Sequence, residues 1–359
     1  MKTLLDSLYN IWIIGTKDIL DALKNNSSRV NIIVILLMVV FFYWLNDIRP
    51  FDKEVTVVVY DEGHTALAIE QEKLADGYEY SFRQAASLQD MEQKMANQHL
   101  GLVLPADLDQ ILASGGTPVL DGYIFWVDRR EVTELEVKYS QALTEIVEHP
   151  VQVVIGDHII IPKASAGGRH TSITYLMVYF VFSMSLLLVP HLMLEERQTK
   201  TIEALFTSPA THGQIVLGKA LAGFFYILII GGLAVALFSA YIVNWFLALA
   251  AWMGYALLAI GIGLLVGSFI KSMKQLGFWM LVLILFFMIP PLFYTSPNLK
   301  AGIRVMFTWA PTSALASLFR FGCSTGATAE QILSNLAVAS ISIVIVFGLV
   351  IWILRRSDR

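Results

Sequence analysis

The sequence has little of three things that soluble enzymes and secreted domains commonly carry. Its single cysteine, Cys323, excludes an internal disulfide framework and a cysteine-rich metal site. The 7 histidines show no spacing of the H-E-x-x-H kind. Charged residues make up only 15% of the chain, whereas soluble domains have about 25%. These shortages point away from a soluble enzyme and towards a chain that sits largely in lipid.

A near match to a nucleotide-binding loop also lacks its decisive residue. Gly213, Gly218 and Lys219 have the G-x-x-x-x-G-K spacing of a phosphate-binding loop. Ala220 stands where a Ser or Thr would hold Mg²⁺, and the preceding run is broken by Pro209 instead of forming an apolar strand. The run after Lys219 is long and apolar. We therefore predict no nucleotide site here, and a lysine at the watery end of a membrane helix.

Long apolar runs dominate what the sequence does contain. The hydrophobic fraction is 56%, and the mean hydropathy is +0.63. A helix needs about 20 mostly apolar residues to cross a bilayer, and six stretches qualify: 30–47, 172–194, 218–243, 247–270, 276–295 and 333–354. No small-residue cleavage site follows the first stretch, so it is interpreted as an uncleaved anchor.

The positive charges of the short loops predict the orientation of these six spans. Cytoplasmic loops carry an excess of Lys and Arg. One assignment places both termini and twelve basic residues in the cytoplasm: Lys2, Lys17, Lys24, Arg29, Arg197, Lys200, Lys219, Lys271, Lys274, Arg355, Arg356 and Arg359. The other side then holds residues 48–170, together with Lys300, Arg304 and Arg320.

Residues 1–29 have the pattern of a helix that lies in a membrane interface. Apolar side chains recur at helical spacing at Leu4, Leu5, Leu8, Ile11, Trp12, Ile19, Leu20 and Leu23. The polar residues Asp6, Lys17, Asp18 and Lys24 lie between them. An amphipathic helix with a tryptophan suits the bilayer surface. The alternative is a helix packed on a soluble partner.

Residues 48–170 change character and predict a compact α/β domain outside the cytoplasm. Runs typical of strands lie at 54–62, 78–85, 100–107 and 118–128. Runs typical of helices lie at 66–77, closed by a glycine, and at 87–98, 108–116 and 131–149. Over residues 50–168 there are 20 Asp and Glu against 8 Lys and Arg. Asp61, Glu62, Asp121 and Asp128 could form a metal site, but no EF-hand spacing is present, so a solvated acidic face is expected.

The segment 195–212, between the second and third predicted spans, carries charge and a small apolar face. Ile202, Leu205 and Phe206 share one side of a short helix, and Pro209 limits that helix. Such a loop suits docking into a groove of a soluble partner. Alternatively, its charges only cap helix ends at the level of the lipid headgroups.

This segment resembles that of ABC-2 type permeases, the membrane subunits of one class of ATP-binding-cassette exporter. The family pattern is E-x-x-x-G-T-x-E-x-L-x-x-[ST]-P, followed by G-K at the next span. The matching residues are Glu196, Thr201, Glu203, Leu205, Ser208, Pro209, Gly218 and Lys219. Lys200 replaces the usual glycine, and Gln198 replaces a common acidic residue. The likeness extends to the N-terminal helix, the "LVLP" strand end and "TWAPTSALASLFRFG" before the last span.

The resemblance implies a polytopic α-helical membrane protein of the bacterial plasma membrane. It implies an interfacial helix over 1–29, a first transmembrane helix over 30–47, an α/β domain over 48–170, a five-helix domain over 171–354 and a cytoplasmic tail over 355–359. ATP and Mg²⁺ are expected on a separate cytoplasmic ATPase subunit in two copies, with no cofactor bound by this chain. A homodimer, or a pair with a similar permease, is expected, with room for a periplasmic adaptor and no nucleic-acid partner.

The same resemblance implies roles for particular residues. The ATPase-coupling residues would be Glu195, Glu196, Arg197, Thr201, Glu203, Leu205, Phe206 and Pro209. An external re-entrant hairpin is expected at about 290–325, with an ordinary amphipathic loop as the alternative. Candidates for the transport path are His191, Pro290, Pro291 and Arg320. Gly263 and Gly267, at G-x-x-x-G spacing, favour close helix packing, either within the subunit or at a dimer interface.

Two other functions compete with an exporter of amphipathic or hydrophobic cargo. An ion-coupled secondary transporter would show internal repeats and charged or broken helices at the midplane. No inverted repeat is visible, and the predicted spans are nearly free of charge. A non-transporting scaffold or sensor would use the acidic domain to meet partners. An adjacent ATPase gene would favour the exporter.

Overall fold

The computed structural model describes most of the chain in two compact units. It describes residues 2–24, 26–47, 54–63, 72–95, 99–164, 174–175, 189–190, 194, 211–270, 272–296 and 298–357. The first unit, here the membrane unit, comprises Met1–Tyr43, Ser172–Cys323 and Ala327–Arg359. The second, here the inserted domain, comprises Trp44–Thr171 and Ser324–Gly326.

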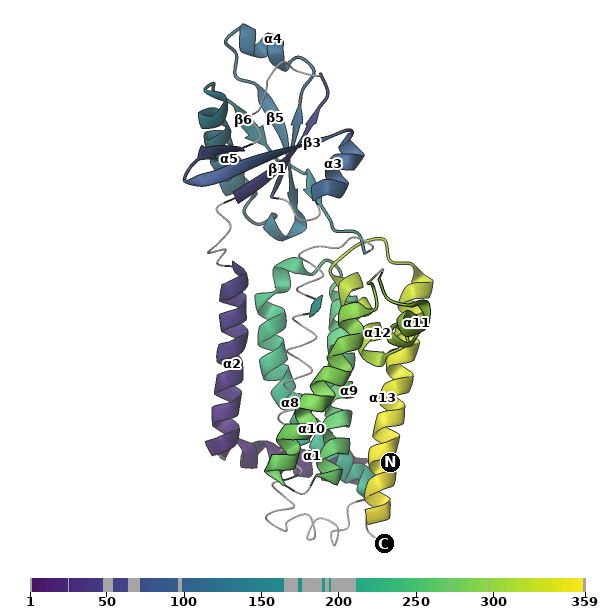
Figure 1. Ribbon diagram of the computed structural model, residues 1–359. Coiled ribbons are helices and arrows are strands. Elements are labelled where there is room, and N and C mark those ends of the chain that lie inside the picture. Colours follow the sequence, from purple (N-terminus) through teal and green to yellow (C-terminus); the bar gives the residue numbers. More distant parts are fainter. Residues whose placement is uncertain are drawn as a thin grey trace. The chain divides into compact units, whose positions relative to one another are not determined.

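The membrane unit is built from long helices and a few short ones (Figure 1). They are α1 (Lys2–Lys24), α2 (Asn26–Asp47), α8 (His212–Leu237), a 3₁₀ turn at Ser239–Tyr241, α9 (Trp245–Phe269), α10 (Met273–Phe293), α11 (Ala301–Thr308), α12 (Pro311–Gly322) and α13 (Ala329–Ser357). Within the unit α1 runs crosswise to α8, at the end where α8 begins (Figure 1).

Four helices of the described chain are long and apolar enough to cross a membrane. They are Gly213–Leu237, Trp245–Phe269, Gln275–Phe293 and Ala329–Arg356. They correspond to the last four predicted spans. The first predicted span falls on α2, whose apolar stretch Ile32–Phe41 is shorter. Nearly all of the second, 172–194, lies outside the described residues. The count of six therefore stays a prediction.

The four candidate spans differ in how much of their surface the unit covers. The apolar stretches of α8 and α9 are 50% and 61% buried, whereas those of α10 and α13 are 18% and 11% buried. Glycine and alanine let neighbours approach α9 closely: Gly254 lies against Leu315 of α12, and Gly261 lies against Val346 of α13. We infer that α9 is the centre of the helical packing.

The inserted domain is a mixed sheet with helices on both faces. Its described strands are β1 (Glu54–Asp61), β2 (Glu72–Ala75), β3 (Tyr78–Ala85), β4 (Leu100–Leu104), β5 (Val119–Phe125), β6 (Gln152–Val154) and β7 (Ile159–Ile160). Its helices are α3 (Leu88–Lys94), α4 (Leu108–Ala113) and α5 (Val132–Val147), with a 3₁₀ turn at Trp126–Asp128. The strand order is β2-β3-β1-β4-β5-β6, and β7 also pairs with β5.

The central strand β1 explains why this sheet is covered on both sides. It pairs in parallel with β3 and with β4, and parallel strands are commonly buried on both faces. Side chains alternate between faces along a strand. Val57 packs in the core on the α5 side with Leu143, and Val58 packs on the other side with Met91 of α3. Figure 1 shows α5 and α3 on opposite faces of the sheet.

One predicted element of this domain is wrong. A helix is predicted over 66–77, but residues 72–75 form strand β2, which is antiparallel to β3. Asp76 and Gly77 form the connecting turn, with φ angles of 56° and 76°. Positive φ at both central residues defines the two-residue hairpin turn that Asp-Gly favours. The glycine taken as a helix end is therefore a hairpin residue.

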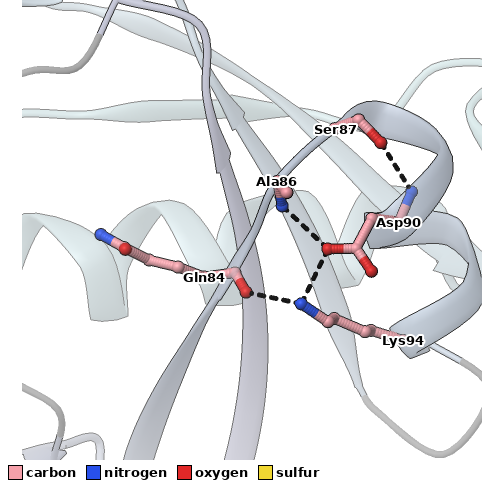
Figure 2. Close-up of polar contacts among 5 residues, drawn as sticks. All are labelled: Gln84, Ala86, Ser87, Asp90 and Lys94. Carbon is pink, nitrogen blue, oxygen red and sulfur yellow. Dashed lines mark hydrogen bonds and ion pairs between the residues drawn. The ribbon is translucent and has the colours of Figure 1, made fainter.

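Polar contacts from both ends of helix α3 tie it to strand β3 and to the residues between them (Figure 2). The Ser87 hydroxyl accepts a hydrogen bond from the amide of Asp90 at 3.1 Å, and the Asp90 carboxylate accepts one from the amide of Ala86 at 2.8 Å. Lys94 lies 2.7 Å from the Asp90 carboxylate and donates to the carbonyl of Gln84 at 3.0 Å. Lys94 and the Ala86 amide together lower the pKa of Asp90. The Ser87 hydroxyl thus caps the start of α3, and Asp90 and Lys94 hold the helix to the residues that precede it.

Candidate functional site

The residues predicted to contact an ATPase lie outside the described part of the chain. These are Glu195, Glu196, Arg197, Thr201, Glu203, Leu205, Phe206 and Pro209, and His191 of the predicted transport path lies outside it too. Their roles stay predictions. The structure does describe what the predicted coupling segment 195–212 leads into, which is the first turn of α8 and the helix α1 packed on it.

The first turn of α8 has a complete capping box. The Thr211 hydroxyl accepts from the amide of Gln214, and the Gln214 side chain accepts from the amide of Thr211 at 2.9 Å. This pairing satisfies two backbone donors that a helix start leaves open. Helix α8 begins at His212, so the Gly213 to Lys219 run is helical. It does not form the loop that a phosphate-binding motif requires.

The structure corrects the predicted environment of Lys219. Its side chain lies in the second turn of α8 and is 1% exposed, so it is shielded from water instead of solvated. Its Nζ lies 3.3 Å from the Oδ2 of Asp18 on α1, whose side chain is 6% exposed. The amphipathic pattern of residues 1–29 assigns Asp18 to the polar positions of the helix, but no sequence signal names its partner 201 residues away.

Two glycines let α1 and α8 approach at backbone distance. A Cβ on Gly218 would lie 2.7 Å from the Cβ of Ile14 and 3.2 Å from the carbonyl of Ile11. A Cβ on Gly15 would lie 3.0 Å from the Gly218 carbonyl. Close backbone approach at small residues is how membrane helices pack tightly. Gly218 of the near-loop motif therefore has a packing role.

Further polar contacts hold the two helices along several turns. The Gln214 side chain donates to the Ser7 hydroxyl at 2.9 Å, near the start of α8. Two turns beyond Lys219, the Tyr226 hydroxyl donates to the carbonyl of Ile19 at 2.7 Å. Together with the Asp18–Lys219 pair, these contacts fix α1 on α8 in one register.

The other side of α1 is apolar and exposed. Leu5, Leu8, Trp12, Leu20 and Leu23 all point away from the unit, with 42% to 62% of their surface exposed. Helix α1 is the helix that the spacing predicts. Its position in a membrane interface stays a prediction, and the exposed apolar face supports it.

Val189 and Pro190 are described residues that pack against α8 and α9. Val189 and Pro190 are buried and contact two glycines: Gly223 of α8 lies against Val189, and Gly263 of α9 lies against both. Gly263 therefore serves packing within the subunit, which was one of the two predicted alternatives.

The predicted hairpin at about 290–325 consists of two short helices after the end of α10. Pro290 and Pro291 lie inside α10, and the Pro290 carbonyl still accepts the amide of Tyr294 at 3.0 Å. Helix α11 has no buried residue, whereas nearly all of α12 is buried. Whether this hairpin enters the bilayer, as a re-entrant hairpin would, stays a prediction.

Helix α12 brings polar side chains into the packed interior. The Tyr255 hydroxyl of α9 donates to the Thr312 carbonyl, and the Ser317 hydroxyl bonds that of Tyr294 at 2.9 Å. The guanidinium of Arg320 lies 5.7 Å from the Tyr294 ring centroid, within cation–π range. Arg320 is thus placed beside the end of α10 that carries the two prolines.

The acidic residues considered for a metal site are not gathered into one. Within the described residues, no group of three or more His, Cys, Asp or Glu comes together as a metal could require. Asp61 instead accepts the amide of Gly63 at 3.0 Å in a turn after β1.

Comparison with known proteins identifies the family. No curated protein matches the chain. A family profile described as "ABC-2 family transporter protein" matches residues 30–352. Membrane domains of this family carry no ATPase domain themselves and generally pair with ABC ATPase subunits. Because the match covers most of the chain, from α2 to α13, the protein belongs to the ABC-2 family and is a multi-pass transporter permease.

Proposed function

We propose that this permease is one subunit of an exporter that moves an amphipathic or hydrophobic cargo outward, driven by ATP hydrolysis on two separate ABC ATPase subunits. The observation that carries the proposal is the start of α8. The segment 195–212 leads directly into a capped helix that is locked to α1 by a buried ion pair. A push on that segment would reach a fixed helical junction and not a free helix end.

The roles proposed for the segment follow its chemistry. Glu196, Arg197 and Glu203 make polar contacts with the ATPase, and Leu205 and Phe206 fill its groove. The remaining members of the set, Glu195, Thr201 and Pro209, shape the loop. ATP-driven closure of the two ATPases moves the segment as a rigid element. ATP and Mg²⁺ stay on the ATPase.

The assembly and orientation are part of the same proposal. Two permease chains, identical or similar, each place segment 195–212 and both termini in the cytoplasm of a bacterial cell. The inserted domain then lies outside, where an adaptor could reach it. In support, α10 and α13 leave most of their apolar surface uncovered within the chain, which suits lipid or a second permease.

The cargo path is proposed to pass the α10–α12 contact. Pro290, Pro291 and Arg320 belong to it, with His191 at the other end of the path. In support, Arg320 is half-buried against Tyr294, in a unit whose central helix α9 carries no charged residue. An uncharged interior suits a cargo that is largely apolar.

A charge reversal in the segment tests the proposal. The full chain is purified with its ATPase in lipid nanodiscs, and ATP turnover is measured with and without the permease. Glu203→Lys should leave the complex assembled and abolish the dependence of ATP turnover on the permease. Glu330→Lys, at an exposed position in the first turn of α13, is the matched control and should behave as wild type. Wild-type turnover in Glu203→Lys, or ATP hydrolysis by the permease alone, would contradict the proposal.

A further inference from the structure

The joint between α1 and α8 contains a buried ion pair that packing alone does not require. Both partners are almost fully covered, Lys219 at 1% and Asp18 at 6% exposure. Taking two charges out of water is costly, and apolar side chains of similar volume often hold such a contact as well or better. We therefore look for the role of the pair in the alignment of α1 on α8, and not in added stability.

An ion pair specifies register, because it forms in only one alignment of the two helices. The Asp18 side chain is short, so it reaches Lys219 only where the helix backbones nearly touch. Gly15 and Gly218 provide that approach, since a Cβ on either would lie within 3.2 Å of the backbone of the other helix. A shift of α1 along α8 would lengthen or break this contact between two buried charges, which is costly, so the contact resists sliding more than an apolar one would.

The helix fixed in this way leads directly to the inserted domain along the chain. Helix α1 ends at Lys24 and α2 begins at Asn26, so a single residue separates them. Helix α2 ends at Asp47, and the first strand of the inserted domain begins at Glu54. The chain therefore runs from α1, which packs on the start of α8, through α2 to the domain's first strand.

We propose that Asp18 and Lys219 are positioning residues of a rigid joint, which carries the ATP-driven displacement of segment 195–212 into α1 and α2 and so to the inserted domain. The proposal rests on the proposed function, because the displacement comes from an ATPase. It adds a second output: the segment moves α8 in the membrane unit and, through the ion pair, also moves the helix that precedes the inserted domain. Such coupling requires one structural element whose conformation depends on both segment 195–212 and the inserted domain, and the α1–α8 joint is that element in this proposal.

The test measures hydrogen–deuterium exchange of peptides covering residues 26–63, in the complete complex in nanodiscs. Exchange without nucleotide is compared with exchange in ATP and vanadate. Wild type should show a nucleotide-dependent difference in these peptides. Asp18→Asn should lose it while keeping the ATPase bound. Asp21→Asn, which removes an exposed charge from the same helix, should keep it.

A covalent replacement separates a mechanical role from a purely structural one. In a Cys323→Ser chain, Gly15→Cys and Leu221→Cys place two cysteines whose Cβ atoms would be 3.2 Å apart, near the 3.5–4.5 Å usual for a disulfide. Oxidation should restore the nucleotide-dependent difference to the Asp18→Asn variant, and reduction should remove it again. If the charges matter for another reason, the disulfide will not restore it, and the proposal fails.

A second variant guards against misfolding of Asp18→Asn. Asp18→Leu with Lys219→Met removes both buried charges at once, so the helices should still pack. The joint should nevertheless lose its fixed register and the exchange difference with it, and the oxidised disulfide should restore both. A wild-type difference in this double variant without the disulfide would overturn the proposal.

Two further outcomes distinguish this inference from the proposed function. If the permease stimulates its ATPase but residues 26–63 show no nucleotide-dependent difference in wild type, the joint does not transmit and only this inference fails. If no ATPase binds or responds to the permease, the proposed function itself fails.

Discussion

The two units of this protein place their apolar and charged side chains in opposite ways. In the inserted domain Val57 and Val58 are fully buried and the charged side chains lie mostly on the surface. In the membrane unit Phe278 and Phe286 of α10 are 64% and 66% exposed, while the Asp18–Lys219 pair is buried. This distribution is expected if the inserted domain is surrounded by water and the membrane unit by lipid. A buried ion pair between two largely apolar helices can specify their contact, because breaking it would leave charge in apolar surroundings.

Among the described glycines, those with a positive φ angle all belong to the inserted domain. In the membrane unit Gly218, Gly254 and Gly322 lie where a Cβ would collide with a neighbouring helix. In the inserted domain Gly77 and Gly115 have open space around them and positive φ angles. Gly218, Gly254 and Gly322 allow helices to pack closely, whereas Gly77 and Gly115 allow the backbone to form turns. Four predictions, two in each unit, test these differences between the membrane unit and the inserted domain.

The largest effect is expected from breaking the buried ion pair. Asp18→Ala leaves the Lys219 ammonium buried without its carboxylate, and such changes cost about 3–5 kcal/mol of folding free energy. The double change Asp18→Leu with Lys219→Met should cost much less. Thermal unfolding of the purified chain in detergent measures both. Equal losses for the two variants would show that the pair is not the source of the cost.

A smaller effect is expected where α1 crosses α8. Gly218→Ala would place a methyl group 2.7 Å from the Cβ of Ile14, and overpacking of this kind costs about 1–3 kcal/mol. Gly213→Ala, one turn and a half earlier in the same helix, has no neighbour within 4 Å and is the matched control. The melting temperature should fall for the first variant only. A similar fall in both would indicate a helix-wide effect instead of a contact.

In the inserted domain the corresponding glycine change should act through backbone conformation. Gly77→Ala forces an alanine to adopt a φ of 76°, which costs about 1–2 kcal/mol for an ordinary residue. Gly77→Asn should cost less, since Asn tolerates this region. Faster amide exchange in residues 72–85 of the alanine variant would report an opened hairpin. If both variants exchange alike, the turn is not strained as described.

The smallest effect is a pH dependence at the edge of the inserted domain's core. Burial raises the pKa of Tyr80 from 10.0 to about 12, with Asp76 adding to the rise. The folded domain therefore holds this proton more tightly than the unfolded chain does. Its stabilising contribution is complete below pH 10 and is lost as the pH rises towards 12. Tyr80→Phe should flatten this alkaline loss when unfolding is followed by amide exchange of β3 at rising pH. An unchanged slope would contradict the assignment to Tyr80.

The sequence was sufficient for features that follow from local pattern. The last four predicted spans correspond to α8, α9, α10 and α13, because a run of apolar residues of that length is a strong signal by itself. The strands predicted over 54–62 and 78–85 correspond to β1 and β3, because valine and aromatic residues favour strands. The failure at 72–75 came from reading Asp76-Gly77 as a helix end and not as a hairpin turn.

The features that sequence reasoning missed depend on partners distant in the chain. Lys219 and Asp18 are 201 residues apart, and neither position has a local pattern that names the other. Strands β6 and β7 are short and owe their pairing to β5. A buried polar pair in a membrane protein is thus the kind of feature that only tertiary structure reveals. The coupling residues stay predictions from resemblance.

The tripeptide between α12 and α13 has a consequence for any attempt to graft or remove the inserted domain. Thr325 donates its amide to the Pro162 carbonyl at 2.9 Å, and its own carbonyl accepts the amide of Ala164 at 2.8 Å. Ser324–Gly326 therefore groups with a domain whose other residues end more than 150 positions earlier in the sequence. A chimaera cut only at the borders of Trp44–Thr171 would leave the Pro162 carbonyl and the Ala164 amide without these partners, so a clean transplant must carry both pieces of polypeptide.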